Sequence, residues 1–232
     1  VSWFTSVEVD KAGTGYTLRF EAPNYCTPPC QMMQPVVSSP FNVIYKLNVT
    51  GEPVQNGTLA GAAISPAVVV EVQDYDGLTV SADSETVVNA SVSHDASRYA
   101  PGSLGGTVTA QSAAGVSTFT SLELDKAGNG FVLRFDAASY CVMPCQLMEG
   151  IDSMGFNIIY KLVVARQPPV TGTLARSSLT PGMVVEVRDA DDVLVVADDE
   201  TRVRVERSSA GRLPGGGGLE GTLSSVAVGG VR

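Results

Sequence analysis

The sequence predicts an all-β protein built from a tandemly repeated antiparallel β-sandwich. Three observations favour this fold class. Short segments rich in valine and threonine alternate apolar with polar residues, glycine and aspartate clusters separate them, and the whole pattern recurs after 115 residues. Short strands at roughly ten-residue spacing with turns between them are typical of sandwiches, and no window of the chain has a helical period.

The 115-residue repeat is the strongest feature of the sequence. Displacing the chain by 115 residues aligns it without a gap, with roughly half of the positions identical. The stretch "FTSVEVDKAGTGYTLRF" from Phe4 matches "FTSLELDKAGNGFVLRF" from Phe119, and "FNVIYKL" from Phe41 matches "FNIIYKL" from Phe156. We therefore expect similar structure at positions 115 residues apart.

The individual strands follow from alternation and from short buried-type runs. Turns are predicted where Asp, Asn and Gly gather, as in "DKAGTG", "DYDG" and "DKAGNG". The predicted strands are 68–74, 86–93, 106–112, 117–124, 131–137 and 156–164.

The alternation of Phe41, Val43, Tyr45 and Leu47 suits the first strand of a unit. This assigns 1–40 to the C-terminal strands of a preceding repeat, 41–155 to a complete repeat and 156–232 to the N-terminal strands of a following repeat. We expect the chain to be a segment of a longer array, cut in register with the repeat. Both ends would then expose unpaired sheet edges.

Charge and composition exclude several classes of function. The formal net charge of -9 and the pI near 4.6 argue against binding to nucleic acid or to an anionic membrane, since both require clustered Lys and Arg. No apolar run is long enough to span a bilayer, and we expect neither membrane insertion in this segment nor a cofactor.

Two cysteine pairs share one spacing. Cys26 and Cys30 lie in "YCTPPC", and Cys141 and Cys145 in "YCVMPC". A redox pair would favour two intervening residues and a following helix, and a zinc site would need all four sulfurs to converge across a whole repeat. We predict two local disulfides, each contributing roughly 2 kcal/mol by loop entropy, with interchain bonds as the alternative.

Three N-glycosylation sequons begin at Asn48, Asn56 and Asn89. Together with the paired cysteines they favour a secreted or surface protein. All three sequons belong to one copy of the repeat, and the equivalent positions hold Val163, Thr171 and Arg204. The two copies would therefore present different surfaces around one kind of core.

The acidic stretches allow two interpretations. "DYDG" with Asp83 and Glu85, and "DADD" with "ADDE", could supply oxygen ligands for calcium between units. Turns are favoured, because Asp commonly caps turns and no calcium-loop spacing is present. We predict no metal site.

Candidate catalytic residues are few. His94 is the only histidine, and the equivalent position in the other copy holds Ser209. No repeated base is therefore available to activate a nucleophile, and paired carboxylates are not visible in the pattern. We predict that the protein is not an enzyme, and that the variable loop 94–105 is the best candidate for contact with a partner.

The run "FTSLELDKAGNGFVL", followed by a loop and "FNI", resembles the closing motif of bacterial-type immunoglobulin-like (Ig-like) repeats of large surface proteins, whose usual form is close to "FTDLSIDKAGTGYTL". The stretch "GTLAGAAISPAVVVEVQDYDG" resembles the opening of the same repeats. This resemblance implies tandem Ig-like β-sandwiches without enzyme activity. Tyr16 then falls where Ig-like folds carry a tyrosine corner, although Phe131 replaces it in the second copy, so that a core aromatic is expected at both.

The cysteine loop departs from that family, whose repeats usually carry a glycine- and serine-rich stretch there. Paired cysteines, sequons and the Ala, Gly and Val bias resemble green-algal surface glycoproteins, among them the mastigoneme (flagellar hair) glycoproteins. The resemblance implies a structural segment of an extracellular filament at a cell or flagellar surface, with other copies or repeats of the protein, a hydroxyproline-rich glycoprotein and N-glycans as partners. The alternatives are an adhesin arm that binds carbohydrate or a cell surface, stiffened by calcium, and an accessory region of an enzyme.

Overall fold

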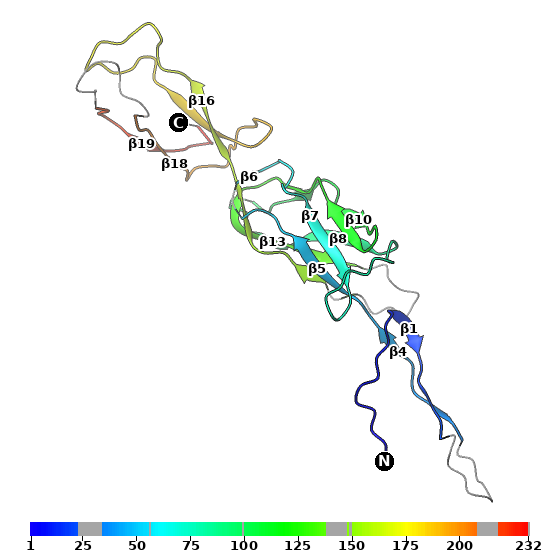
Figure 1. Ribbon diagram of the computed structural model, residues 1–232. Helices are drawn as coiled ribbons and strands as arrows, with labels where there is room; N and C mark the ends of the chain where they lie inside the picture. Colours follow the sequence, from blue (N-terminus) through cyan, green and yellow to red (C-terminus); the bar gives the residue numbers. More distant parts are fainter. Residues whose placement is uncertain are drawn as a thin grey trace, which may run out of the picture.

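A computed structural model describes residues 1–22, 34–55, 57–98, 100–137, 148, 150–207 and 218–231. Within these ranges the chain forms strands and turns and no helix, which confirms the all-β class. The molecule is elongated, with a compact central body between two smaller sets of strands that contain the N-terminus and the C-terminus (Figure 1).

The first sheet of the central body is antiparallel and has three strands. Its order is β11 (Val116–Phe119), β7 (Val68–Gln73) and β5 (Lys46–Gly51). Strand β7 is central, and its pattern of alternating buried valines, Val68, Val70 and Val72, is that of a strand with one face on a core.

The second sheet runs through β10 (Thr109–Gln111), β8 (Val87–His94), β13 (Gly128–Asp136), β15 (Phe156–Ile159) and β6 (Thr58–Leu59). Strand β14 (Ile151–Asp152) pairs with β13, and a separate pair joins β9 (Leu104–Gly105) to β12 (Glu123–Leu124). All pairs are antiparallel except β15 with β6.

Side chains from both sheets share one hydrophobic core. Phe119 of the first sheet and Phe135 of the second lie at its centre, with ring centroids 5.3 Å apart. Both rings are almost fully buried. Burial of aromatic side chains on this scale is the main source of stability for a body of this size.

The N-terminal strands lie outside this core. Strand β1 (Gly13–Tyr16) pairs with β4 (Phe41–Val43), and β2 (Arg19–Phe20) pairs with β3 (Val36–Val37). Trp3 and Phe4, which precede them, are exposed.

The C-terminal strands form two further pairs. Strand β16 (Lys161–Arg166) pairs with β17 (Val184–Arg188), and β18 (Arg202–Arg204) pairs with β19 (Ser224–Val226). Val187 and Ala227 are buried here, whereas Leu162 is 56% exposed.

The structure divides the predicted strand 156–164 into two. Strand β15 ends at Ile159 and pairs with β13 of the central body, whereas β16 begins at Lys161 and pairs with β17. The sequence-based division placed 156 at the start of the following repeat, and the exchange of strand partners falls after Ile159. The predicted strand 41–47 divides in the same way into β4 and β5. Alternation continues across both breaks, so the sequence pattern carries no signal of the exchange.

Candidate assembly surfaces and modification sites

Two of the sequon asparagines lie on strands of the central body. Asn48 follows Leu47 on β5, and Asn89 follows Val88 on β8. Because Leu47 and Val88 are buried in the core and side chains alternate along a strand, both asparagines point away from the core. They belong to different sheets, so glycans at the two positions would extend from opposite faces of the body.

The two asparagines differ in their surroundings. Asn89 is exposed and its side-chain oxygen accepts a hydrogen bond from the Thr109 hydroxyl at 2.9 Å. Asn48 is half-buried beside Glu71, which also accepts a hydrogen bond from the hydroxyl of the sequon residue Thr50 at 3.1 Å. Asn56 lies outside the described residues, so nothing is added there to the sequence prediction.

The four cysteines also lie outside the described residues, within 23–33 and 138–147. The two local disulfides, Cys26 with Cys30 and Cys141 with Cys145, therefore stay predictions.

The acidic stretches act as turn caps. The Asp74 carboxylate accepts the backbone N–H of Leu78 at 2.9 Å, and Asp189 accepts that of Val193 at 2.9 Å. Asp83 is buried and its carboxylate accepts backbone N–H bonds at the start of β8. These bonds are those of aspartate-capped turns.

The half-buried Glu71 carboxylate accepts several side-chain hydrogen bonds. The Thr79 hydroxyl donates to it at 2.6 Å and the Gln73 amide at 3.0 Å, and these bonds lower the pKa of Glu71. The bonds connect β7 to the turn that follows it, and they stabilise the ionised form.

The loop 94–105 is held by Asp95. One carboxylate oxygen accepts hydrogen bonds from the hydroxyl and the backbone N–H of Ser97, and the other accepts the N–H of Gly102 at 2.9 Å. The bonds from Ser97 lower the pKa of Asp95. The loop that the sequence proposed for partner contact is therefore closed by its own carboxylate.

The junction between the central body and the C-terminal strands is made by specific polar contacts. Within the C-terminal strands, the Lys161 ammonium at the start of β16 lies 2.9 Å from an Asp192 carboxylate oxygen and donates to the Ala190 carbonyl at 3.1 Å, in the turn that follows β17. The Ala190 N–H donates to the Ala60 carbonyl of the central body at 2.9 Å. The hydrogen bond from Lys161 lowers the pKa of Asp192.

A second contact crosses the same junction. Arg98 of the central body lies 3.2 Å from Glu200 of the C-terminal strands. A pocket of about 510 Å³ lies at this junction, with Tyr160, Lys161 and Thr201 among its lining residues. Residues of both parts line this pocket, among them Asn129 of the central body and Val187 of the C-terminal strands.

The equivalent lysine of the central body makes the equivalent contact with the turn that follows β7, close to the N-terminal strands. Lys46, 115 residues before Lys161, donates to the Tyr75 carbonyl at 3.2 Å. A pocket of about 790 Å³ lies beside it, lined by residues that include Lys11, Tyr45 and Asp74. The sequence analysis did not single out these lysines, although the identical "YKL" in both copies could have indicated them.

Lys126 and Asp125 form an ion pair in the central body, with the Lys126 ammonium 2.7 Å from an Asp125 carboxylate oxygen. Burial raises the pKa of Asp125, but hydrogen bonds from Lys126 and from the backbone N–H of Ser103 outweigh it, so that the pKa is lowered overall. The same bond raises the pKa of Lys126.

Tyr16 and Phe131 occupy equivalent positions in the two copies of the repeat but differ in their contacts and burial. The Tyr16 hydroxyl donates to the Lys11 carbonyl at 3.2 Å, five residues upstream, which is the kind of bond that a tyrosine corner makes. Phe131 is fully buried and lies 6.2 Å from Phe156 between ring centroids.

The remaining candidate features are the histidine, a metal site and a membrane-spanning helix. His94 is exposed at the end of β8. In the part of the chain that the structure describes, no three His, Cys, Asp or Glu side chains gather closely enough to hold a metal ion. That same part contains no helix that could cross a membrane.

Both ends of the molecule expose apolar side chains whose equivalents in the central body are buried. Phe4 is 65% exposed and Phe119 is 1% exposed; Leu162 is 56% exposed and Leu47 is 4% exposed.

No protein-family model matches the chain, and a search of curated proteins found no similar sequence.

Proposed function

We propose that the chain is a non-enzymatic structural segment of an extracellular glycoprotein, built from tandem Ig-like sandwiches that assemble into a filament or surface appendage such as a mastigoneme. The observation that carries this proposal is the recurrence of contacts at a displacement of 115 residues along an elongated molecule. This recurrence supports the proposal independently of the sequence resemblance, because equivalent contacts would place successive units at regular spacing.

Strand pairs, turn caps and lysine contacts all recur at positions 115 residues apart. Tyr16 of β1 pairs with Phe41 of β4, and Phe131 of β13 pairs with Phe156 of β15. The turn caps of Asp74 and Asp189 recur in the same way, and so do the contacts that Lys46 and Lys161 make within their own units. Units that contact mainly their neighbours along the chain form a quasi-linear array, whose length grows with the number of repeats.

The junctions support a stiff connection between successive units. The Ala190–Ala60 backbone hydrogen bond and the Arg98–Glu200 pair cross the junction, and only Tyr160 lies between β15 and β16. Each exposed ion pair contributes little by itself, so we assign the stiffness to the short connection and the backbone bond. A spacer or filament component requires this property, whereas an enzyme does not.

The remaining parts of the proposal concern partners and location. N-glycans at Asn48 and Asn89 would project from opposite faces of the central body, and other copies or repeats of the protein would be its main partners. A hydroxyproline-rich glycoprotein would pack laterally. The cell or flagellar surface is the compartment that suits predicted disulfides and sequons together.

Electron microscopy of the protein from its native source, with and without a calcium chelator, tests the proposal. Regular filaments that survive chelation are expected. Dispersed flexible rods, or rods that collapse when calcium is removed, would reject the filament and favour an adhesin arm stiffened by calcium. A hydrolase or transferase activity that co-purifies with the chain would reject the non-enzymatic assignment.

A further inference from the structure

Strand β13 of the central body contains an asparagine that is followed directly by a glycine. Asn129 and Gly130 occupy its second and third positions. Asparagine is a thermolabile residue, because the backbone nitrogen of the next residue can attack its side-chain amide carbon. A following glycine hinders that attack least, since glycine has no Cβ. The equivalent dipeptide in the other copy is Thr14–Gly15, which has no amide to react.

The reaction at this dipeptide is deamidation. The Gly130 nitrogen forms a bond to the side-chain amide carbon of Asn129, and the bond from that carbon to its NH₂ group breaks. The NH₂ group leaves as ammonia with the proton of the Gly130 N–H, and a five-membered imide remains. Water then opens the imide at one of its two carbonyls, which gives aspartate or isoaspartate. Water is the only co-reactant.

The structure holds the attacking nitrogen in a hydrogen bond. The Gly130 N–H donates to the side-chain oxygen of Asn157, Oδ1, at 3.0 Å. Asn157 lies on β15, directly opposite Asn129 in the antiparallel ladder. The nitrogen must give up this bond and then its proton before it can attack, so the hydrogen bond adds to the barrier.

The strand conformation adds a second obstacle. Side chains stand roughly perpendicular to a sheet, whereas the N–H groups of a ladder point along the sheet toward the neighbouring strand. The Asn129 side chain is exposed, and the Gly130 N–H points at Asn157. A bond can form only when the two reacting atoms are close and aligned. Attack therefore requires local opening of the β13–β15 pair.

The dipeptide lies at a β-bulge beside the hydrophobic core. The pairing register shifts between Asn129 and Phe131, and Gly130 has a φ of 92°. Phe131 is fully buried, with its ring centroid 6.2 Å from that of Phe156. Isoaspartate would insert a methylene group into the backbone of β13 just before this buried ring. A bulge fixes the direction of the side chains that follow it, so the insertion would disturb the packing of Phe131.

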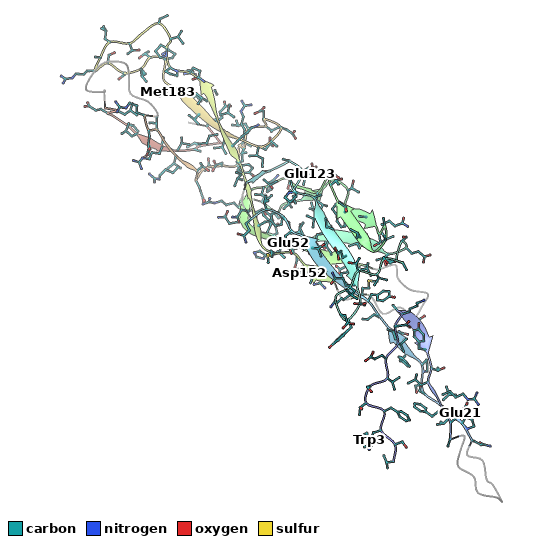
Figure 2. All side chains as sticks on the ribbon, in the orientation of Figure 1. Trp3, Glu21, Glu52, Glu123, Asp152 and Met183 are labelled. Atoms are coloured by element: carbon teal, nitrogen blue, oxygen red, sulfur yellow. The ribbon has the colours of Figure 1, made fainter. Side chains whose placement is uncertain are left out.

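These contacts lie wholly within the central body, which Figure 2 shows between the labelled residues Trp3 and Met183. The hydrogen bond itself recurs in the other copy, where the Gly15 N–H donates to the side-chain oxygen of Asn42 at 3.0 Å. The asparagine that accepts the bond is thus common to both copies, whereas only one copy places a reactive asparagine before the glycine.

We infer that Asn129 is a site of spontaneous deamidation, and that Asn157 is a positioning residue that slows the reaction by holding the Gly130 N–H. The rate is set by local opening of the β13–β15 pair, and the product carries one additional negative charge. This inference goes beyond the proposed function and does not depend on it.

Peptide mapping by mass spectrometry, during incubation of the whole chain at mildly alkaline pH, tests the inference. The mass increase from replacing NH₂ by OH is followed in the peptide that contains Asn129, separately from Asn56, which also precedes a glycine. We expect slow deamidation of Asn129 in the folded wild type and much faster deamidation in urea. Asn157→Ala should accelerate the reaction in the folded chain roughly fivefold, as the loss of one hydrogen bond predicts.

Two further variants separate the hydrogen bond from general destabilisation. Asn42→Ala removes the equivalent bond to Gly15, so it is the matched control and should leave the rate at Asn129 unchanged. Asn157→Asp keeps an acceptor oxygen for the Gly130 N–H and should retain the slow rate of the wild type. This variant decides the question if Asn157→Ala loosens the strand pair as a whole.

Three results would overturn the inference: equal rates at Asn129 in the folded chain and in urea, equal rates in Asn157→Ala and Asn42→Ala, or a rate in Asn157→Asp as fast as in Asn157→Ala. None of these bears on filaments in native material, which test the proposed function. Conversely, absence of native filaments would leave the deamidation rates unaffected.

Discussion

Replacing Phe119 by alanine is expected to destabilise the central body by about 4 kcal/mol. The side chain is 1% exposed and packs against Phe135 at 5.3 Å between ring centroids. A buried phenylalanine removes on the order of 150 Å² from water, which at about 25 cal/mol per Å² gives about 4 kcal/mol. Measured Phe→Ala costs of roughly 3 to 5 kcal/mol agree, because a cavity remains after the truncation.

The matched control is Phe4→Ala at the equivalent position. Because Phe4 is 65% exposed, its truncation should change the stability of an isolated copy by less than about 0.5 kcal/mol. The only tryptophan, Trp3, lies outside the central body, so its fluorescence does not report on the core. Hydrogen exchange measured by mass spectrometry on peptides from β7 and β13, over a urea series at low protein concentration, reports on it directly.

Two results would refute this reasoning. A cost below about 1 kcal/mol for Phe119→Ala would mean that the two sheets do not share a tightly packed core. A cost for Phe4→Ala as large as that for Phe119→Ala, persisting on dilution, would mean that the N-terminal segment is covered within a single copy.

Three further predictions concern backbone, pH and glycans. Gly106→Ala should destabilise the central body far more than Gly130→Ala. Both glycines have positive φ, which costs a side chain roughly 1 to 2 kcal/mol, but of the two only Gly106 lies where an added Cβ would clash with a backbone oxygen, that of Ser121. Equal losses of stability in urea unfolding would contradict this. Since the pKa of Asp125 is lowered on folding, its contribution is complete above its ordinary pKa of about 4 and is lost as the pH falls through the folded value. The stability difference between wild type and Asp125→Asn should therefore shrink as the pH is lowered below about 4, and a constant difference would exclude it. Expressed through a eukaryotic secretory pathway, Asn48→Gln and Asn89→Gln should each remove one glycan from the intact mass, and an unchanged mass would show that the sequon is unused.

Two strands of the central body were predicted closely, whereas the predicted strand 117–124 divides into β11 and β12. The predicted strands 68–74 and 86–93 correspond to β7 and β8 within a residue at each end. These two predictions succeed because the alternation of valines with other residues, which gives a strand one buried face, can be read from neighbouring positions alone. The turn caps at Asp74 and Asp189 were predictable for a similar reason, since an aspartate caps backbone groups only a few residues away.

The partners of those strands were not predictable in the same way. The run from Phe156 to Val164 alternates as one strand, yet β15 pairs with the central body and β16 with the C-terminal strands. The junction contacts of Lys161 and the Arg98–Glu200 pair likewise join residues distant in sequence. The pattern of residues along one strand does not indicate which other strand or surface will pack against it.

The sequence by itself determined the all-β class, the 115-residue period and the positions that alternate toward a core, because each depends on residues close together along the chain. Only the tertiary structure decided which equivalent side chains are covered: Phe119 is buried and Phe4 is exposed in nearly identical sequence contexts. Burial depends on the arrival of a second sheet, which brings together residues far apart in the chain. For that reason the difference in exposure between the two equivalent phenylalanines became visible only in the folded molecule.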